Sequence, residues 1–358
     1  MRDMHVNRRQ WFASALAASA ASAAPVSLKQ KVRLAVIGQD GHLGEILNPL
    51  PGLPDVEVVA CCDYTPAALD ALSKKPALQK AKPFLDQEKM LDEMKPDVVA
   101  VVNDDGARAK AVILTLQRGI HCIAEKPLAI TKTDLLKIKR IARDSKGNLG
   151  MLVPLRYSPQ FMALRQVVDS GEIGEVLLLG GQKSYKRGAN SLWKNKRASY
   201  GSTMLWIGPH LIDLFYFTGR QKLTEAFCWQ ANVQDPTIGD RENVVGAVFR
   251  LANGGVAEMR MDYLRPDTAP THEDDRLRVA GTKGIVEYTA ATGVTVISNA
   301  GKPRRVEALP AAGQVFVDFL EATYLNKPAS LSKADIFHVS DAIQAAEDSS
   351  RVGRPVKI

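Results

Sequence analysis

The stretch that decides the fold is KVRLAVIGQDGHLG, residues 31–44. Its apolar, β-branched run ends at Gly38, and two further glycines follow at Gly41 and Gly44. Glycines spaced in this way let a chain turn sharply from a strand into a helix and let its backbone approach a pyrophosphate. Because the first glycine stands one residue earlier than in the usual G-x-G-x-x-G pattern, the loop needs support from the residues that follow it.

That support comes from Asp63, which ends a second strand-like run, VEVVACCD. It stands about 20 residues beyond the loop, where an acidic side chain binds the ribose hydroxyls of a dinucleotide. No arginine that could receive a 2′-phosphate follows directly, so we predict NAD, with NADP as the less favoured cofactor. The alternative is a flavodoxin-like domain with an ordinary glycine turn. The predicted cofactor-binding residues of this part are Gly38, Gly41, His42, Leu43, Gly44 and Asp63.

Strand-like and helix-like runs alternate from residue 31 to residue 150. Runs such as PDVVAVVND are apolar on both faces, which is typical of a parallel sheet covered by helices on both sides. Helix starts are marked by capping residues, for example Thr65 ahead of Pro66, because a threonine oxygen accepts a free backbone N–H there. We therefore predict a Rossmann-type α/β domain over residues 31–150.

The pattern changes after residue 150. One helix-like run is followed by six strand-like runs between Glu175 and Ala300. A turn signal, Ala252-Asn253-Gly254-Gly255, lies between two of them and indicates antiparallel strands. We expect an α+β domain over 151–358 with a large open antiparallel sheet and a C-terminal helix that packs back on the first domain. Several of these runs are rich in Val, Leu and Phe and leave more apolar surface than one layer of helices can cover. This predicts a homodimer or homotetramer that forms through the open sheet.

The N-terminal residues 1–24 differ from the rest of the chain. They combine a basic start, a short apolar stretch and a small-residue site, Ala21-Ser22-Ala23, which together predict an export signal. Arg8-Arg9 followed by Gln10-Trp11-Phe12 resembles the twin-arginine type, a route that exports folded proteins, often with their cofactor. We expect a periplasmic or otherwise exported protein; the alternative is a disordered basic tail.

Composition excludes some other classes. No run approaches the roughly 18 consecutive apolar residues of a membrane helix, so no stable membrane span is expected. The net charge of +8 is spread along the chain and favours anionic ligands only slightly. The four cysteines lie in β-like runs without zinc spacing, so we predict core residues and no metal site.

A set of motifs between the two halves resembles the Gfo/Idh/MocA family of glucose–fructose oxidoreductase and inositol dehydrogenase relatives. The most specific is Glu125-Lys126-Pro127, which follows the strand-like run IHCIA. It is supported by Arg156 in PLRYSP, by SGEIGEV and by the spacing Gly208-x-His210-x-x-Asp213. The resemblance runs from about Val32 to the closing SSRVGRPVKI.

This resemblance implies that Lys126 lies beside the nicotinamide ring and the substrate hydroxyl. It also implies that the peptide bond between Lys126 and Pro127 is cis. Burial and the positive ring of the oxidised cofactor should depress the pKa of this lysine toward working pH. The alternative is a lysine that only pairs with Glu125 at a turn. His210 matches the catalytic histidine, with Asp213 beside it; the alternative is a core histidine that Asp213 satisfies.

Two departures from the family concern the site. Trp206 stands where an aspartate, four residues before the histidine, usually completes a catalytic pair. The stretch VNDDGARA, which begins near Asn103, lacks the usual Pro and His. Both bear on substrate and reaction type more than on fold or cofactor. We still assign Asn103 and Glu125 to cofactor binding.

Substrate binding is predicted from aromatic and cationic residues. The segment KSYKRGANSLWKNKRASYG, residues 183–201, interleaves lysine and arginine with aromatic side chains. Such a pattern can mimic a nucleic-acid patch, but exported proteins rarely meet nucleic acid, so we expect a carbohydrate-binding loop or a solvated surface loop. The run from His272 to Asp275 holds four polar side chains without a further anchoring ligand, so a cleft rim is preferred to a metal site. The predicted substrate residues are Arg156, Tyr185, Trp193, Trp206 and His272.

The resulting hypothesis is an exported NAD-dependent oxidoreductase that acts on a sugar, polyol or sugar derivative. Lys126 and His210 would supply acid–base help, while a tightly bound cofactor supplies the redox chemistry. The first alternative is a redox-neutral enzyme that uses NAD to hydrolyse a glycoside or to epimerise a sugar. The second is a non-catalytic sugar-binding relative, which Trp206 favours and the intact Lys126 and His210 oppose.

Overall fold

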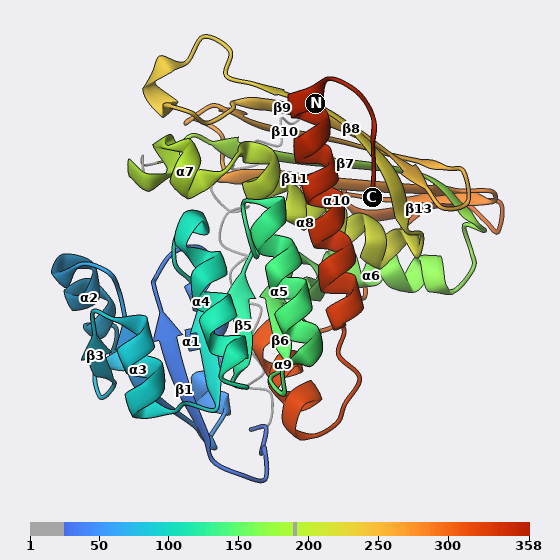
Figure 1. Cartoon of the computed structure of the whole chain (residues 1–358). Coiled ribbons are helices and arrows are strands. Elements are labelled where there is room, and N and C mark those ends of the chain that lie inside the picture. Colours follow the sequence, from blue (N-terminus) through green and yellow to red (C-terminus); the bar gives the residue numbers. More distant parts are fainter. Residues whose placement is uncertain (1–24, 189–191) are drawn as a thin grey trace, which may run out of the picture.

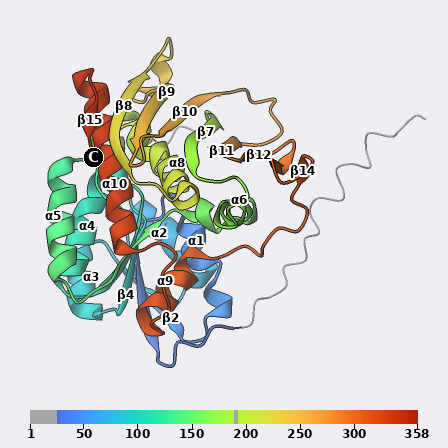
Figure 2. The same ribbon diagram turned by 90° about the vertical axis from the view of Figure 1, so that its right-hand side faces the viewer.

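A computed structural model describes residues 25–188 and 192–358 (Figure 1). The predicted export signal, residues 1–24, lies outside the described residues, as do residues 189–191 of the predicted carbohydrate loop. The described chain forms two sheets, one in each half of the molecule, with helices between and around them (Figures 1 and 2). Within the described ranges, no helix is both long and apolar enough to cross a lipid bilayer.

The first sheet is parallel throughout and has the strand order β3-β2-β1-β4-β5-β6. This is the order of a Rossmann fold, so the predicted class is confirmed. The sequence pattern did not predict β3 and β6, because β3 has only three residues and β6 contains a glycine in a run of four. The strands are β1 Val32–Ile37, β2 Val56–Cys62, β3 Lys82–Phe84, β4 Val98–Val101, β5 His121–Glu125 and β6 Leu149–Leu152.

Helices cover both faces of this sheet, as the two-sided apolar strands require. One apolar cluster joins a face of β1 and β4 to α1, α2 and the distant α9, and the other joins the opposite face to α3, α4 and α5. Cys61 and Cys62 point into different clusters and are buried as free thiols, in agreement with the predicted core role. The helices are α1 Leu43–Leu47, α2 Pro66–Ser73, α3 Gln87–Met94, α4 Asp105–Gln117, α5 Lys132–Asp144 and α9 Val315–Tyr324.

Side-chain caps fix where several of these helices begin. The Thr65 side chain accepts from the backbone N–H of Ala68 at 3.2 Å, as predicted. Thr131 caps α5 in the same way, accepting from Asp134 N at 3.1 Å. Each cap satisfies a backbone donor that has no partner inside the helix.

The second sheet has nine strands in the order β14-β13-β12-β11-β7-β10-β9-β8-β15. Neighbours are antiparallel except β7 and β10, which run parallel. The predicted antiparallel pairing does not hold for this one pair, because the β8–β9–β10 meander runs inward from β8 and ends beside β7. One predicted run also proved to be two strands, β11 and β12. The strands are β7 Val176–Lys186, β8 Leu223–Ala231, β9 Val244–Leu251, β10 Val256–Arg265, β11 Glu273–Gly281, β12 Gly284–Thr289, β13 Gly293–Ser298, β14 Arg304–Arg305 and β15 Val356–Lys357.

Helices lie on the side of this sheet that faces the first domain (Figure 1). The long C-terminal helix α10 contacts both halves: Gln344 Nε2 donates to Ala129 O at 3.1 Å, and Ser349 Oγ accepts from Cys228 N at 3.1 Å. The other face of the sheet carries exposed apolar side chains, among them Trp229, Val248 and Val256. The remaining helices are α6 Pro159–Asp169, α7 Arg197–Tyr200, α8 Thr203–Gly219 and α10 Lys333–Val352.

Candidate active site

The glycine loop lies where the connections from neighbouring strands β1 and β4 leave on opposite faces of the parallel sheet. Ligands of open α/β sheets bind in this crevice, at the carboxyl ends of the strands. Gly38 has φ 82° and Gly41 has φ 61°, a backbone region that L side chains rarely adopt. A Cβ on Gly38 would lie 2.5 Å from Asn103 Cα, and one on Gly41 would collide with the Glu125 carboxylate. The loop therefore needs glycine at both positions.

The residues around this crevice fit a dinucleotide. Asp63 follows β2 and is half-buried; one oxygen accepts from Tyr64 N at 2.7 Å and the other lies 3.3 Å from Gln39 Nε2. Asn103 is buried, and among the described residues its Oδ1 has no hydrogen-bond donor. A carboxylate after the second strand and an unpaired buried carbonyl after the fourth are groups that a ribose and a nicotinamide amide can engage.

Glu125 holds the glycine loop against β5. Its Oε1 accepts from the backbone N–H of His42 at 2.5 Å and also contacts His42 Nδ1, while its Oε2 accepts from Lys126 N at 2.7 Å. Burial alone would raise the pKa of Glu125, but His42, Lys126 and Arg108 outweigh it and lower the pKa to about 2. Glu125 was predicted to bind the cofactor. Its described contacts position the glycine loop.

Lys126 lies at the carboxyl end of β5, and its peptide bond to Pro127 is cis. The side chain is only 3% exposed; Nζ donates to the Trp206 carbonyl and lies 4.4 Å from the centre of the Trp206 ring. Burial lowers its pKa from 10.5 to about 8, although Glu125 and Asp105 act in the opposite direction. A lysine with a pKa this close to neutrality can both take and return a proton.

His210 lies on α8, opposite the glycine loop. It is 4% exposed, and its ring stands edge-on to the His42 ring at a centroid distance of 5.2 Å. Burial, assisted by the charge of Lys126, holds the pKa of His210 well below its usual range, so the imidazole is neutral. Its Nδ1 has no hydrogen-bond partner in the described part of the chain. The core-histidine alternative required a hydrogen bond between Asp213 and His210. The described residues show no such bond.

Asp213 and Arg156 bind each other instead. Arg156 Nε donates to Asp213 Oδ2 at 3.0 Å, its second nitrogen contacts Oδ1, and its third donates to Ser330 O. Both side chains are almost fully buried. These contacts support a structural role, in place of the catalytic role predicted for Asp213 and the substrate-binding role predicted for Arg156. The physical reason is that a buried guanidinium needs a carboxylate partner.

The four predicted aromatic substrate residues form a connected group. The Tyr185 ring lies 6.3 Å from Trp206 and 5.5 Å from the exposed His272. Trp193 lies 6.4 Å from Tyr200, which in turn lies 5.9 Å from Trp206. Trp193 also reaches the first domain, because its Nε1 donates to Asp40 Oδ1 in the glycine loop at 3.2 Å. The group therefore contacts the first domain at Asp40 in the glycine loop and at Lys126.

Sequence reasoning missed several charged residues of this site. Lys183 on β7 is 1% exposed, and its Nζ lies 2.7 Å from Asp275. Lys194 places its Nζ 4.1 Å from the Trp206 ring, on which Lys126 also stacks. The available signal for Lys183 was its register, because it shares the inward face of β7 with Leu179 and Gly181. In the part of the chain that the structure describes, no three His, Cys, Asp or Glu side chains converge as a metal site.

Two family models match the chain. Residues 32–152 match the oxidoreductase family with an NAD-binding Rossmann fold, and residues 161–287 match the GFO/IDH/MocA C-terminal domain. Fold and site thus define a dinucleotide-binding Rossmann protein with a second, open-sheet domain. The chain belongs to the Gfo/Idh/MocA family, and its first domain is an NAD-binding Rossmann domain. The resemblance drawn from Glu125-Lys126-Pro127 is confirmed.

The chain is similar to curated dehydrogenases. Inositol 2-dehydrogenase from Salmonella typhimurium is 28% identical over 187 residues, 52% of this chain and 52% of that protein. D-glucoside 3-dehydrogenase from Escherichia coli K12 is 27% identical over 224 residues, 58% of this chain and 63% of that protein. The chain spans about half the length of the curated relatives it matches.

Solved structures share the whole architecture. A Thermotoga maritima protein described as an oxidoreductase is 29% identical, with a TM-score of 0.83 over 91% of this chain and 100% of that chain. Levoglucosan dehydrogenase in complex with NADH has a TM-score of 0.79 over 92% of this chain and 99% of that chain. At 18% identity the second likeness establishes the fold alone.

Asp63→Ala is expected to weaken NAD binding by about 1.5–3 kcal/mol, because it removes a charged acceptor of ribose hydroxyls. Isothermal titration of NAD into wild type and variant measures the change. Asp70→Ala is the matched control, since Asp70 is an exposed carboxylate on the neighbouring α2 that pairs with Lys74. Equal dissociation constants for wild type and Asp63→Ala would remove Asp63 from the site.

Proposed function

We propose that the protein is an NAD-dependent oxidoreductase that oxidises a CH–OH group of a sugar, polyol or sugar derivative. The observation that carries the proposal is the buried Lys126, with its pKa of about 8, at the carboxyl end of β5 beside the glycine loop. When bound, NAD supplies the hydride acceptor. The curated relatives named above, which act on inositol and a glucoside, support the substrate class.

The chain's own residues then provide proton transfer and orientation. Neutral Lys126 can take the proton of a substrate hydroxyl, and the nearby Trp206 carbonyl holds the resulting ammonium group. The neutral imidazole of His210 offers a free Nδ1 to a second hydroxyl. The faces of Trp193, Trp206 and Tyr185 can stack on a sugar ring, while Lys194 favours a ring that carries a carboxylate or phosphate.

A redox-neutral reaction is the second candidate. A glycosyl hydrolase family 109 protein from Akkermansia muciniphila is 26% identical over 163 residues, 43% of this chain. That likeness supports a variant in which the substrate takes its hydride back. Net hydrolysis or epimerisation without accumulation of NADH would favour this candidate.

Initial rates on a panel of polyols, aldoses, uronic acids and glycosides test the proposal. Each compound is incubated with the purified protein and NAD, and both NADH absorbance and the sugar product are followed. NADH formation with an oxidised product supports the oxidoreductase, and product formation without NADH supports the redox-neutral enzyme. Tight NAD binding with no conversion of any compound would favour the non-catalytic sugar-binding relative.

The predicted export signal suggests how the cofactor would be kept. An envelope compartment holds little free NAD, so we propose that the protein binds NAD(H) tightly, folds around it and is exported with it. Such retention needs a dissociation constant below micromolar, or more than about 8 kcal/mol of binding. Replacing Arg8 and Arg9 by lysine should leave the protein in the cytoplasm on cell fractionation; unchanged export of this variant would contradict the proposed route.

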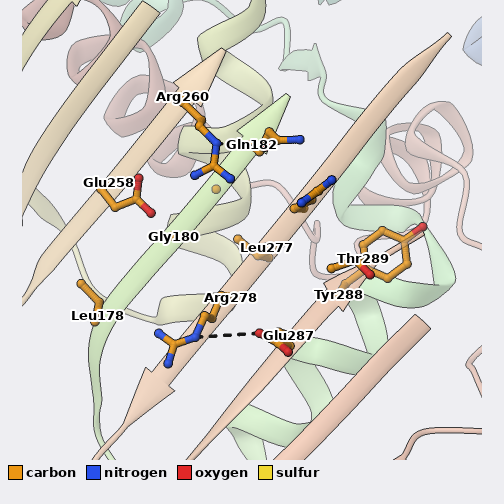
Figure 3. Close-up of a pocket in the computed structure, with 12 residues that line it drawn as sticks. Leu178, Gly180, Gln182, Glu258, Arg260, Leu277, Arg278, Glu287, Tyr288 and Thr289 are labelled. Carbon is orange, nitrogen blue, oxygen red and sulfur yellow. Dashed lines mark hydrogen bonds and ion pairs between the residues drawn. The ribbon is translucent and has the colours of Figure 1, made fainter. Parts of the chain in front are cut away.

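The open face of the second sheet supports a homo-oligomer. Figure 3 shows a hollow on this face, where Leu178, Glu258, Arg260, Arg278 and Glu287 project from four neighbouring strands. Apolar side chains flank these charges: Leu178 is 40% exposed, Val248 46% and Trp229 65%. Exposed apolar side chains gathered on one face, here around a charged hollow, are typical of a protein–protein contact.

Val248→Arg should therefore dissociate the oligomer by at least one step, because two copies would bury like charges against the same face. Light scattering across a dilution series measures the mass. Leu136→Arg is the control, since Leu136 is 55% exposed on α5, away from this sheet. A wild-type monomer at all concentrations would contradict the proposed assembly.

A further inference from the structure

The first turn of α4 contains a buried ion pair between Asp105 and Arg108. Both residues are 1% exposed, and Arg108 lies 2.7 Å from Asp105 Oδ1. Apart from this ion pair, no donor in the described ranges makes a hydrogen bond to either Asp105 oxygen. Buried carboxylates normally have such donors. Asp105 therefore keeps unused acceptor capacity in the interior.

Arg108 fixes this pair beside Lys126. One of its terminal nitrogens donates to the carbonyl of Pro127, the residue after Lys126, at 2.9 Å. The other donates to Asn103 O. The Lys126 ammonium group itself has a carbonyl and an aromatic ring as its described partners, not a carboxylate. Glu125 is already engaged by His42 and by Lys126 N. Asp105, whose described partner is the Arg108 guanidinium, is thus the other acidic group of this buried cluster.

Charges face Lys126 from every element packed against it. Glu125 on β5 and Asp105 on α4 raise its pKa, whereas burial, Arg108 on α4 and Lys194 lower it. The charge of Lys126 also lowers the pKa of the His210 imidazole on α8. Burial raises the pKa of Asp105 to about 6, against the effects of Arg108 and Lys126. Asp105 therefore raises the pKa of Lys126, and Lys126 lowers the pKa of Asp105.

We propose that Asp105 is a positioning residue that sets the charge of Lys126. When Lys126 takes a proton from a substrate hydroxyl it becomes an ammonium ion, and ionised Asp105 stabilises that ion. Trp206 stands where family members usually carry an aspartate, and its side chain has no carboxylate that could stabilise the ammonium ion. Asp105 on α4 provides a carboxylate instead. The consequence for turnover rests on the proposed function, but the charge coupling is a property of the chain alone.

The pH dependence of Lys126 acetylation tests the coupling without a substrate. The full-length protein is labelled with trace acetic anhydride at a series of pH values, and the extent at Lys126 is read by mass spectrometry. Asp105→Asn should lower the labelling midpoint by about one pH unit, because it removes a nearby negative charge. Asp104→Asn is the matched control: Asp104 is half-buried, caps α4 by accepting from Ala107 N at 3.1 Å, and asparagine caps equally well. Its midpoint should stay at the wild-type value.

A second variant keeps the test valid if Asp105→Asn fails to fold around an unpaired Arg108. Asp105→Asn/Arg108→Gln removes both charges, whose effects on Lys126 oppose each other. Its midpoint should lie below the wild-type value but above that of Asp105→Asn. A midpoint at or above the wild-type value, in whichever variant folds, overturns the proposal.

Kinetics separate this inference from the proposed function. The acidic limb of kcat/KM against pH should move with the labelling midpoint, whereas a merely structural role would lower kcat/KM without moving the limb. A shifted midpoint with no turnover of any sugar or polyol would refute the proposed function and leave the coupling in place. Turnover with an unmoved midpoint and limb would refute the coupling alone.

Discussion

Lys126→Met is expected to lower kcat/KM for substrate oxidation at least about 100-fold, the lower bound for loss of a general acid–base group. Methionine keeps much of the apolar stem of the lysine but cannot take the hydroxyl proton. NAD affinity should change little, because the glycine loop is held by Glu125 and not by the lysine ammonium group. Lys110→Met is the control, since Lys110 is exposed on α4 and should leave turnover unchanged.

The same variant should be more stable than wild type near neutral pH. The folded-state pKa of Lys126, about 8, lies below its ordinary value of 10.5, so the folded protein disfavours the charged lysine. Below pH 8 the wild type carries this cost in full, up to about 3 kcal/mol, and it fades as the pH rises toward 10.5. Urea unfolding at several pH values measures the difference. Normal turnover in Lys126→Met would mean that the lysine is only structural.

Asp213→Ala is expected to destabilise the protein by about 3–5 kcal/mol, because it leaves Arg156 buried without its carboxylate partner. The Arg156→Met/Asp213→Leu double variant should recover much of this loss, since it removes both charges together. Unfolding free energies of the two variants and of wild type provide the test. A stable Asp213→Ala protein that has lost turnover would restore the predicted catalytic role of Asp213.

The sequence predicted the parts of the fold that depend on local pattern. The run before Gly38, the acid at Asp63 and the Thr65 cap identified strands and helices correctly because each carries a strong local signal. The strand β6 and the parallel pairing of β7 with β10 were not predicted, because neither has a signature of its own. Their pairing depends on how distant segments meet.

The site divides in the same way. The glycine loop, Lys126 and His210 were found by motif, and the structure brings them together. Asp213 and Arg156 also fitted the motif, but their mutual pairing depends on the packing of α8 against residues 154–157, which spacing does not reveal. Asp105, Arg108 and Lys183 were missed because a charged residue in a sequence gives no sign that it is buried.

The account depends most on NAD held beside Lys126, and the nucleotide released from the purified protein tests this directly. The protein is purified without added nucleotide and denatured, and its supernatant is analysed by mass spectrometry. We predict NAD or NADH at close to one molecule per chain, with the same amount in Lys126→Met. A protein that releases no nucleotide and does not bind added NAD in a calorimetric titration would contradict the account.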